Sequence, residues 1–237
     1  MLSAVLLFVG QTSLPAPDST RTRDSTHFSA NIRFVSAAGN ATSSTFSLGD
    51  KYEKFLGSWT FGQEFQMIYG TDGTTTLANF YLFNLSGKYA LNTRTQLMGY
   101  GGWQRNTPAG LEQRFEEGIG VTYVAMDKPK DKINVEGGPT LVQESRPDGD
   151  RHFTAARLAA DYNHTFREKT TFEQKFEYMP DLSVFANYQF NSHTALAVPV
   201  SGIVGVALSY DVRYNNQPPP GFKKADRFFT AGLQLTR

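Results

Sequence analysis

The sequence predicts an all-β protein, a transmembrane antiparallel up-and-down β-barrel of about twelve strands. Three observations predict it. Apolar and polar residues alternate along segments of about 10 to 15 residues, no apolar run is long enough for a spanning helix, and short connections alternate with long ones. A strand between lipid and an aqueous interior shows this period of two, because successive side chains point to opposite faces of a sheet.

The alternation is clearest in residues 203–214. One phase holds Val204, Val206, Leu208, Tyr210, Val212 and Tyr214, and the other holds Gly205, Ala207, Ser209, Asp211 and Arg213. The same pattern recurs in residues 28–34, 59–69, 172–178, 184–190 and 229–235. In residues 94–104, glycines occupy both phases, so the inward set there stays open. The pattern alone does not say which phase faces inward. An interior of twelve strands is too wide for apolar side chains to fill easily, which favours a polar lumen over a soluble sandwich or a lipocalin-like barrel.

Composition sets the limits on class and chemistry. The mean hydropathy of −0.38 and an apolar share of 40% suit a barrel, in which only alternate residues meet lipid. A net charge of +1 offers no bulk attraction to nucleic acid. The absence of cysteine removes disulfides, thiol catalysis and thiolate metal sites. We expect no cofactor and no bound metal.

We divide the chain into a signal-peptide-like segment (1–16), a polar linker (17–26) and the barrel (27–237). Residues 2–9 have the length of a signal core, but no basic residue precedes them and Pro17 follows the best cleavage position, Ala16. Tight connections are expected near Gly57 and at 92–94, 127–131, 167–169 and 201–202. Longer ones are expected at 70–74, 106–110, 145–150 and 215–225. Outer-membrane barrels place the tight set in the periplasm and the long set outside the cell.

Charged residues of the polar phase are the candidate lumen lining. A charge on the lipid face costs about 2–4 kcal/mol at the bilayer midplane for Arg or Lys, so these residues should face inward. They are Arg33, Glu64, Glu116, Glu136, Arg157, Asp161, Glu173, Lys175, Glu177, Asp211 and Arg213. They could line a narrow pore for small solutes, or they could neutralise one another and occlude the lumen. Because their signs nearly balance, no strong ion selectivity is expected.

Catalysis is the remote alternative. A hydrolase would need a histidine beside a serine or a carboxylate. His193 lies in the polar phase, but the adjacent Ser192 points to the opposite face of the same strand, so the pair does not form a nucleophile and its base. We therefore expect no enzyme.

From about Asn31 to its end, the chain resembles a family of salt-induced outer-membrane proteins whose biochemical activity is uncharacterised. The resemblance rests on the small-residue turn at 36–42, the Gly-rich strand at 118–123 and the Gly-Gly-Pro at 137–139. The most specific part is the strand at 208–214, which is followed by Pro218-Pro219-Pro220-Gly221-Phe222-Lys223-Lys224-Ala225-Asp226. The resemblance implies an outer-membrane barrel, possible involvement in salt or osmotic stress, and no catalytic residues.

The expected partners follow from this location. They are the lipid bilayer, the barrel-insertion machinery and lipopolysaccharide, whose phosphates Lys223 and Lys224 could contact, and we expect a monomer. One departure concerns insertion, because the chain ends Leu235-Thr236-Arg237 where such barrels usually end in an aromatic residue.

Overall fold

The computed structural model describes residues 24–37, 43–72, 75–166 and 170–236. Over these residues the chain forms twelve strands, as predicted, and one short 3-10 turn, η1 (Thr107–Ala109). The strands are β1 (Asp24–Ala37), β2 (Ser43–Leu56), β3 (Trp59–Asp72), β4 (Thr75–Ala90), β5 (Thr95–Asn106), β6 (Leu111–Asp127), β7 (Asp131–Ser145), β8 (Arg151–Thr165), β9 (Thr171–Pro180), β10 (Tyr188–Pro199), β11 (Val204–Asn215) and β12 (Ala225–Thr236). Within the described part of the chain, no helix is long and apolar enough to cross a membrane.

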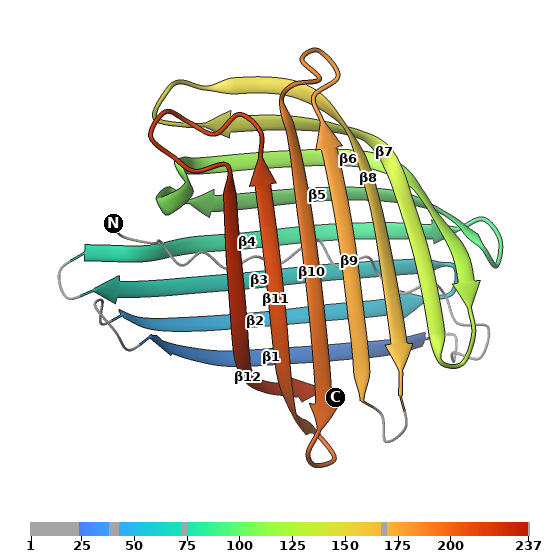
Figure 1. Cartoon of the computed structure of the whole chain (residues 1–237). Coiled ribbons are helices and arrows are strands. Elements are labelled where there is room, and N and C mark those ends of the chain that lie inside the picture. Colours follow the sequence, from blue (N-terminus) through green and yellow to red (C-terminus); the bar gives the residue numbers. More distant parts are fainter. Residues whose placement is uncertain (1–23, 38–42, 73–74, 167–169, 237) are drawn as a thin grey trace.

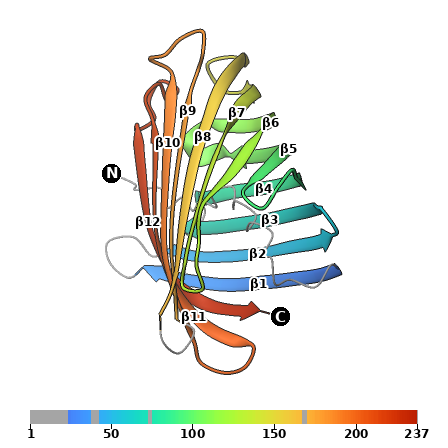
Figure 2. The ribbon, with the colours of Figure 1, turned by 90° about the vertical axis from the view of Figure 1, so that its right-hand side faces the viewer.

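Each strand pairs antiparallel with its neighbours in sequence, and β1 pairs with β12, so the sheet closes on itself. Figures 1 and 2 show β1–β5 and β9–β12 as two facing walls whose strands run in clearly different directions. Such crossing is expected when strands are inclined to the axis of a barrel. Among the described residues the closing seam is short: four residue pairs join β1 to β12, whereas fourteen join β1 to β2.

The polar phase faces inward and the apolar phase faces outward. Thr122 and Asp211 are fully buried, whereas Leu85, Ile119 and Leu158 are each more than half exposed. A soluble barrel would bury its apolar phase, so this arrangement indicates a lipid-facing exterior. The open question of β5 is answered in the same way, because Gln96 and Asn106 of its even-numbered phase are buried.

Connections differ in length between the two ends of the barrel. At one end, hereafter the tight-turn end, β2 and β3 are separated by residues 57–58 and β6 and β7 by 128–130. At the other, the long-loop end, the connections 146–150, 181–187 and 216–224 are longer. The predicted turn at 167–169 lies outside the described residues, as does the signal-like segment 1–16.

Three predicted boundaries were wrong. β1 begins at Asp24, inside the predicted linker, and β3 and β4 extend to Asp72 and Thr75, so the expected loop 70–74 is shorter. The alternation at 184–190 predicted a strand that in fact begins only at Tyr188. Asp181 ends the preceding strand, because its carboxylate accepts the backbone N–H groups of the two residues at 183 and 184 and so forms a turn.

Candidate functional site

The lumen holds a buried group of charges at its centre, which we call the middle layer: Lys88, Glu136, Arg157 and Glu177. Lys88 of β4 donates a 2.5 Å hydrogen bond to Glu136 of β7. Arg157 of β8 donates to Glu136 at 2.9 Å and to Glu177 of β9 at 2.7 Å. The side chains of Lys88, Glu136 and Arg157 are only 2–3% exposed. Because β4 and β7 are not neighbours in the sheet, the layer ties separate parts of the wall together across the interior.

Tyr100 extends this layer toward β5. Its side chain lies over Gly118 of β6, where an added Cβ would come within 2.3 Å of the ring. The hydroxyl group of Tyr100 therefore reaches past β6 and shares a 2.5 Å hydrogen bond with Thr140 of β7. The guanidinium of Arg157 lies 5.3 Å from the centre of the Tyr100 ring, within the range of a cation–π interaction. The glycine thus makes room for an aromatic side chain that would otherwise clash.

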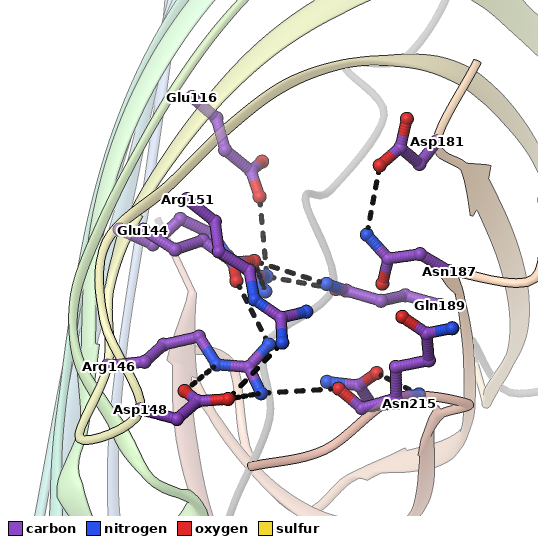
Figure 3. A network of polar contacts seen from close by, with 11 residues as sticks. Glu116, Glu144, Arg146, Asp148, Arg151, Asp181, Asn187, Gln189 and Asn215 are labelled. Atoms are coloured by element: carbon purple, nitrogen blue, oxygen red, sulfur yellow. Dashed lines mark hydrogen bonds and ion pairs between the residues drawn. The ribbon is translucent and has the colours of Figure 1, made fainter. Parts of the chain in front are cut away.

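A second group lies nearer the long-loop end, and we call it the outer layer: Arg114, Glu144 and Gln189. Arg114 of β6 is bonded to Glu144 of β7 and donates to Gln189 of β10 at 2.9 Å. Gln189 in turn donates to Glu144 at 3.4 Å. Figure 3 shows Glu144 and Gln189 approaching each other from opposite sides of the interior. The outer layer therefore bridges the β6–β7 wall and the β10 wall.

A further contact crosses the lumen close to this layer. The guanidinium of Arg213 on β11 lies 5.2 Å from the centre of the Phe80 ring on β4. Phe80 is fully buried in the inward phase, whereas Phe83 and Leu85 in the outward phase of β4 are exposed. The contact joins two strands that are well separated in the order of the sheet. Together with the two layers, it narrows the passage along the barrel axis.

The proline-rich connection between β11 and β12, residues 216–224, folds over the mouth of the barrel. We call it the proline loop. Arg146 of the β7–β8 connection donates to the backbone carbonyl of Gln217 at 3.3 Å. On the far side, a Cβ added to Gly110 would lie 2.8 Å from the Phe222 ring and 2.9 Å from Pro219. The sequence predicted a long connection here, and the structure adds that it contacts the connections of two other hairpins.

Beneath the proline loop lies a cavity of about 80 Å³, which we call the vestibule. Its lining comes from β5, β6, β7, β10 and β11 and from the proline loop. A smaller cavity of about 30 Å³ lies deeper and shares Gln104, Arg114, Gln189 and Asn191 with it. The vestibule is therefore the part of the lumen that opens toward the long-loop end, and the outer layer forms its floor.

The structure describes the side chains of all the predicted lumen residues except Arg33. Glu64, Glu136, Arg157, Asp161 and Asp211 are buried, and Glu116, Glu173, Lys175, Glu177 and Arg213 are partly buried. Asp161, Lys175, His193 and Asp211 stand in one row across β8–β11, because each is paired with the next in the strand register. Opposite charges directly across neighbouring strands stabilise a sheet.

Sequence reasoning missed several residues of the site. Lys88, Arg114, Glu144 and Gln189 form its central contacts but were not among the predicted lumen residues. Lys88 could have been found, since it alternates with the apolar Tyr89. Glu144 stands between Gln143 and Ser145, so the alternation gave no signal there. Tyr100 lies in the glycine-rich segment whose phase was ambiguous. Its inward position depends on Gly118 of another strand.

His193 has a carboxylate partner but no serine partner among the residues that the structure describes. Its Nδ1 lies 2.5 Å from Asp211 Oδ1. Ser209 contacts Asp211 at 3.4 Å rather than the histidine, and Ser192 accepts a hydrogen bond from Gln174 instead. A serine hydrolase needs the histidine between the serine and the carboxylate. In the described part of the chain, no group of three His, Asp or Glu side chains is placed to hold a metal ion.

Comparison with known proteins agrees with this architecture. A family model described as "Protein of unknown function, DUF481" matches residues 30–236. No curated protein matches the chain. Among solved structures, a NanC porin is similar with a TM-score of 0.57 at 9% identity, over 88% of this chain and 98% of that one.

Two further porins are similar at lower scores. A KdgM porin in complex with disordered oligogalacturonate has a TM-score of 0.47 at 9% identity, over 89% of this chain and 98% of that one. An anion-selective porin from Comamonas acidovorans has a TM-score of 0.43 at 9% identity, over 90% and 100%. At such identities the likeness concerns the fold. The similarity to the NanC porin supports a porin-like β-barrel fold, whereas the predicted link to salt stress stays a prediction.

Proposed function

Because the chain belongs to the DUF481 family, whose description supplies no activity, we propose its function from the lumen itself: a narrow, passive pore for small hydrophilic solutes. The observation that carries the proposal is the inward polar phase, bridged across the interior at the middle and outer layers. A polar interior gives water and solutes a path that lipid does not. The bridging side chains restrict that path, so large solutes are excluded.

We place this pore in a bacterial outer membrane, with the tight-turn end in the periplasm and the long-loop end outside the cell. Aromatic side chains that are exposed or partly exposed near both ends of the barrel support this placement. The rings of Trp59 and Tyr89 contact each other near the tight-turn end, and the ring of Tyr188 contacts those of Tyr178 and Tyr214 near the long-loop end. Aromatic residues in two girdles mark the two interfaces of a membrane barrel.

The membrane location is tested on detergent gels and by fractionation. A folded barrel resists the detergent, so the unboiled and boiled proteins should migrate differently and the protein should be found with the outer membrane. Identical migration together with recovery in the soluble fraction would overturn the location.

Conductance tests the pore. The purified protein, refolded in detergent and added to planar bilayers, should give small discrete current steps over a range of salt concentrations. Replacing Gln189 by Ala should enlarge the steps, because it removes the contacts from β10 to the outer layer and leaves the Arg114–Glu144 pair intact.

The matched control is Gln143→Ala. Gln143 lies on β7 near the same end but is exposed on the outward face, so its loss should leave the step size unchanged. If neither wild type nor Gln189→Ala gives any steps, the barrel is occluded and the pore proposal is wrong. An equal increase for both variants would show that the outer layer does not set the conductance.

A further inference from the structure

The charged residues that line the vestibule are mainly basic, which a pore that selects solutes by size alone does not require. Among its charged lining residues, Arg114, Arg146, Arg213, Lys223 and Lys224 are basic and Glu144 is acidic. The lumen as a whole has nearly balanced charges, so the bias is local to the mouth. A cavity lined by one sign of charge concentrates solutes of the opposite sign.

The two lysines of the proline loop add positive charge that no acidic side chain of the described residues neutralises. Arg114 and Arg146 are both bonded to Glu144 or to acidic neighbours. Lys223 and Lys224 are exposed, and among the described residues neither has an acidic partner. Lys224 donates only to the side-chain oxygen of Asn216, at 3.0 Å. Their ammonium groups therefore have hydrogen-bond donors left for an anion.

Buried polar atoms of the lining also lack partners. The side-chain oxygen of Asn106 is buried without a hydrogen bond, and the residue is 2% exposed. The Nε–H group of Arg114 is likewise buried without an acceptor. Both residues line the vestibule. The two atoms themselves have almost no accessible surface, so side chains of the lining must shift slightly to open them to a ligand. A buried polar group without a partner is costly, and such groups in a native structure call for a ligand, an ion or water.

We propose that the vestibule is a binding site for a small organic anion that carries hydroxyl groups. Its carboxylate accepts hydrogen bonds from Lys223, Lys224 and the Nε–H of Arg114. A hydroxyl group of the same molecule donates to the side-chain oxygen of Asn106. The proposal rests on the pore function in one respect: the bound anion is the solute class that enters the pore.

The size of the cavity limits the ligand. A volume of about 80 Å³ holds roughly six water molecules, at about 10–15 Å³ for each water centre. A three-carbon hydroxy acid replaces about that many waters. Glycerate is therefore the probe, because it combines one carboxylate with two hydroxyl groups. Propionate keeps the carboxylate without hydroxyl groups, and glycerol keeps the hydroxyl groups without the charge.

Binding is measured by isothermal titration calorimetry on the full-length protein folded in detergent. Glycerate should bind roughly tenfold more tightly than either propionate or glycerol, since each lacks one set of charge-assisted or neutral hydrogen bonds. Equal affinity for glycerate and propionate would overturn the role of Asn106. Equal affinity for glycerate and glycerol would overturn the role of the basic residues, and no binding of glycerate would overturn the site.

Variants test the contacts to the carboxylate and the contact to the hydroxyl group separately. Replacing both Lys223 and Lys224 by Ala should weaken glycerate binding roughly tenfold and leave glycerol unaffected. The matched control replaces Lys128 and Lys130, which are exposed at the tight-turn end, and should not change binding. Asn106→Leu should reduce the affinity for glycerate to that for propionate. Heat-modifiable migration on gels shows that each variant is folded, and unchanged binding in a folded Lys223/Lys224 variant would overturn the proposal.

The two proposals fail in different ways. Calorimetry detects the anion whether or not the lumen conducts, and bilayer recordings detect conductance whether or not glycerate binds. If the protein binds glycerate without conducting, the binding site is supported and the pore proposal is wrong. If it conducts but binds no glycerate, the pore is supported and the binding-site proposal is wrong.

Discussion

Arg157 is the residue that joins the buried charges of the middle layer. It donates to Glu136 and Glu177 and lies against the ring of Tyr100, so it contacts three strands besides its own. A buried guanidinium is tolerated only when its charge is matched and its donors are used. Arg fits this place better than Lys, because its planar fork can serve two carboxylates at once.

Replacing Arg157 by Met should therefore destabilise the barrel strongly. Glu177 would lose its cation, and the loss of one partner of a buried pair costs about 3–5 kcal/mol. The free energy of unfolding is measured by urea titration of the protein in detergent micelles, with tryptophan fluorescence as the signal. Arg105→Met is the control, because Arg105 is exposed on the outward face of β5, and it should change the free energy by less than about 0.5 kcal/mol. Equal effects of the two variants would mean that the middle layer adds little stability.

The sequence predicted fewer of the contacts between individual side chains than it did of the strands. Period two assigned Glu136 and Arg157 to the polar phase, but it could not show that Arg157 touches both Glu136 and Glu177. Pairs such as Lys88 with Glu136 join strands that are not neighbours. They depend on the width and tilt of the barrel, which the alternation along one strand does not encode.

At the scale of elements, the proline loop is the segment whose position has the clearest consequence. Pro218, Pro219 and Pro220 restrict the backbone and remove donors, so the loop cannot extend the sheet. It is held instead from both sides, by Arg146 at its start and by the close approach of Phe222 to Gly110. Gly110 also has a φ of 72°, a region that favours glycine. The sequence predicted a long connection but not its contacts, which join residues far apart in the chain, such as Arg146 and Gln217.

Replacing Gly110 by Ala should loosen the proline loop. The new Cβ would meet the Phe222 ring and Pro219 at less than 3 Å, so the loop must move away. Trypsin cleaves after lysine, and faster cleavage at Lys223 and Lys224 in proteoliposomes reports the movement.

Gly149→Ala is the control that distinguishes a steric contact of the new Cβ from backbone strain at a positive φ. Gly149 also has a positive φ, but an added Cβ would meet nothing within 4 Å. Cleavage at the two lysines should stay at the wild-type rate in this variant. The same rate in all three proteins would contradict the close packing of the loop against Gly110.

At the scale of the whole molecule, the sequence predicted the number of strands and the difference between the two ends. Both depend on short stretches of sequence, namely the alternation within each strand and the turn residues between strands. The alternation alone did not give the direction of each phase, since inside and outside are properties of the closed sheet. That prediction needed the further arguments from the width of the interior and from the cost of charges in lipid. Residue 184 illustrates the limit. The alternation there continued the pattern of the following strand, but the turn around Asp181 places it in a loop.

The closure of the sheet into a barrel can be tested at the short seam between β1 and β12. The four pairs between β1 and β12 include Ala30 opposite Leu235, and residues directly opposite have Cβ atoms about 4.5–5.5 Å apart. The chain contains no cysteine, so a pair of introduced cysteines reports only this contact. Ala30→Cys with Leu235→Cys should form an intramolecular disulfide in the folded protein under mild oxidation, because small shifts bring such a pair to bonding geometry.

Joining residues 30 and 235 ties almost the whole chain into a ring, which changes its migration on a denaturing gel without reductant. Ala30→Cys with Ala231→Cys is the control, since Ala231 is opposite Leu208 of β11 rather than Ala30. A disulfide in the control in place of the first pair would show that the seam is shifted along the strand. If neither pair forms, β1 and β12 are apart in the folded protein and the sheet is open. An open sheet edge cannot face lipid, because its backbone groups would lack partners there, so the disulfide also tests whether this chain alone makes a complete membrane barrel.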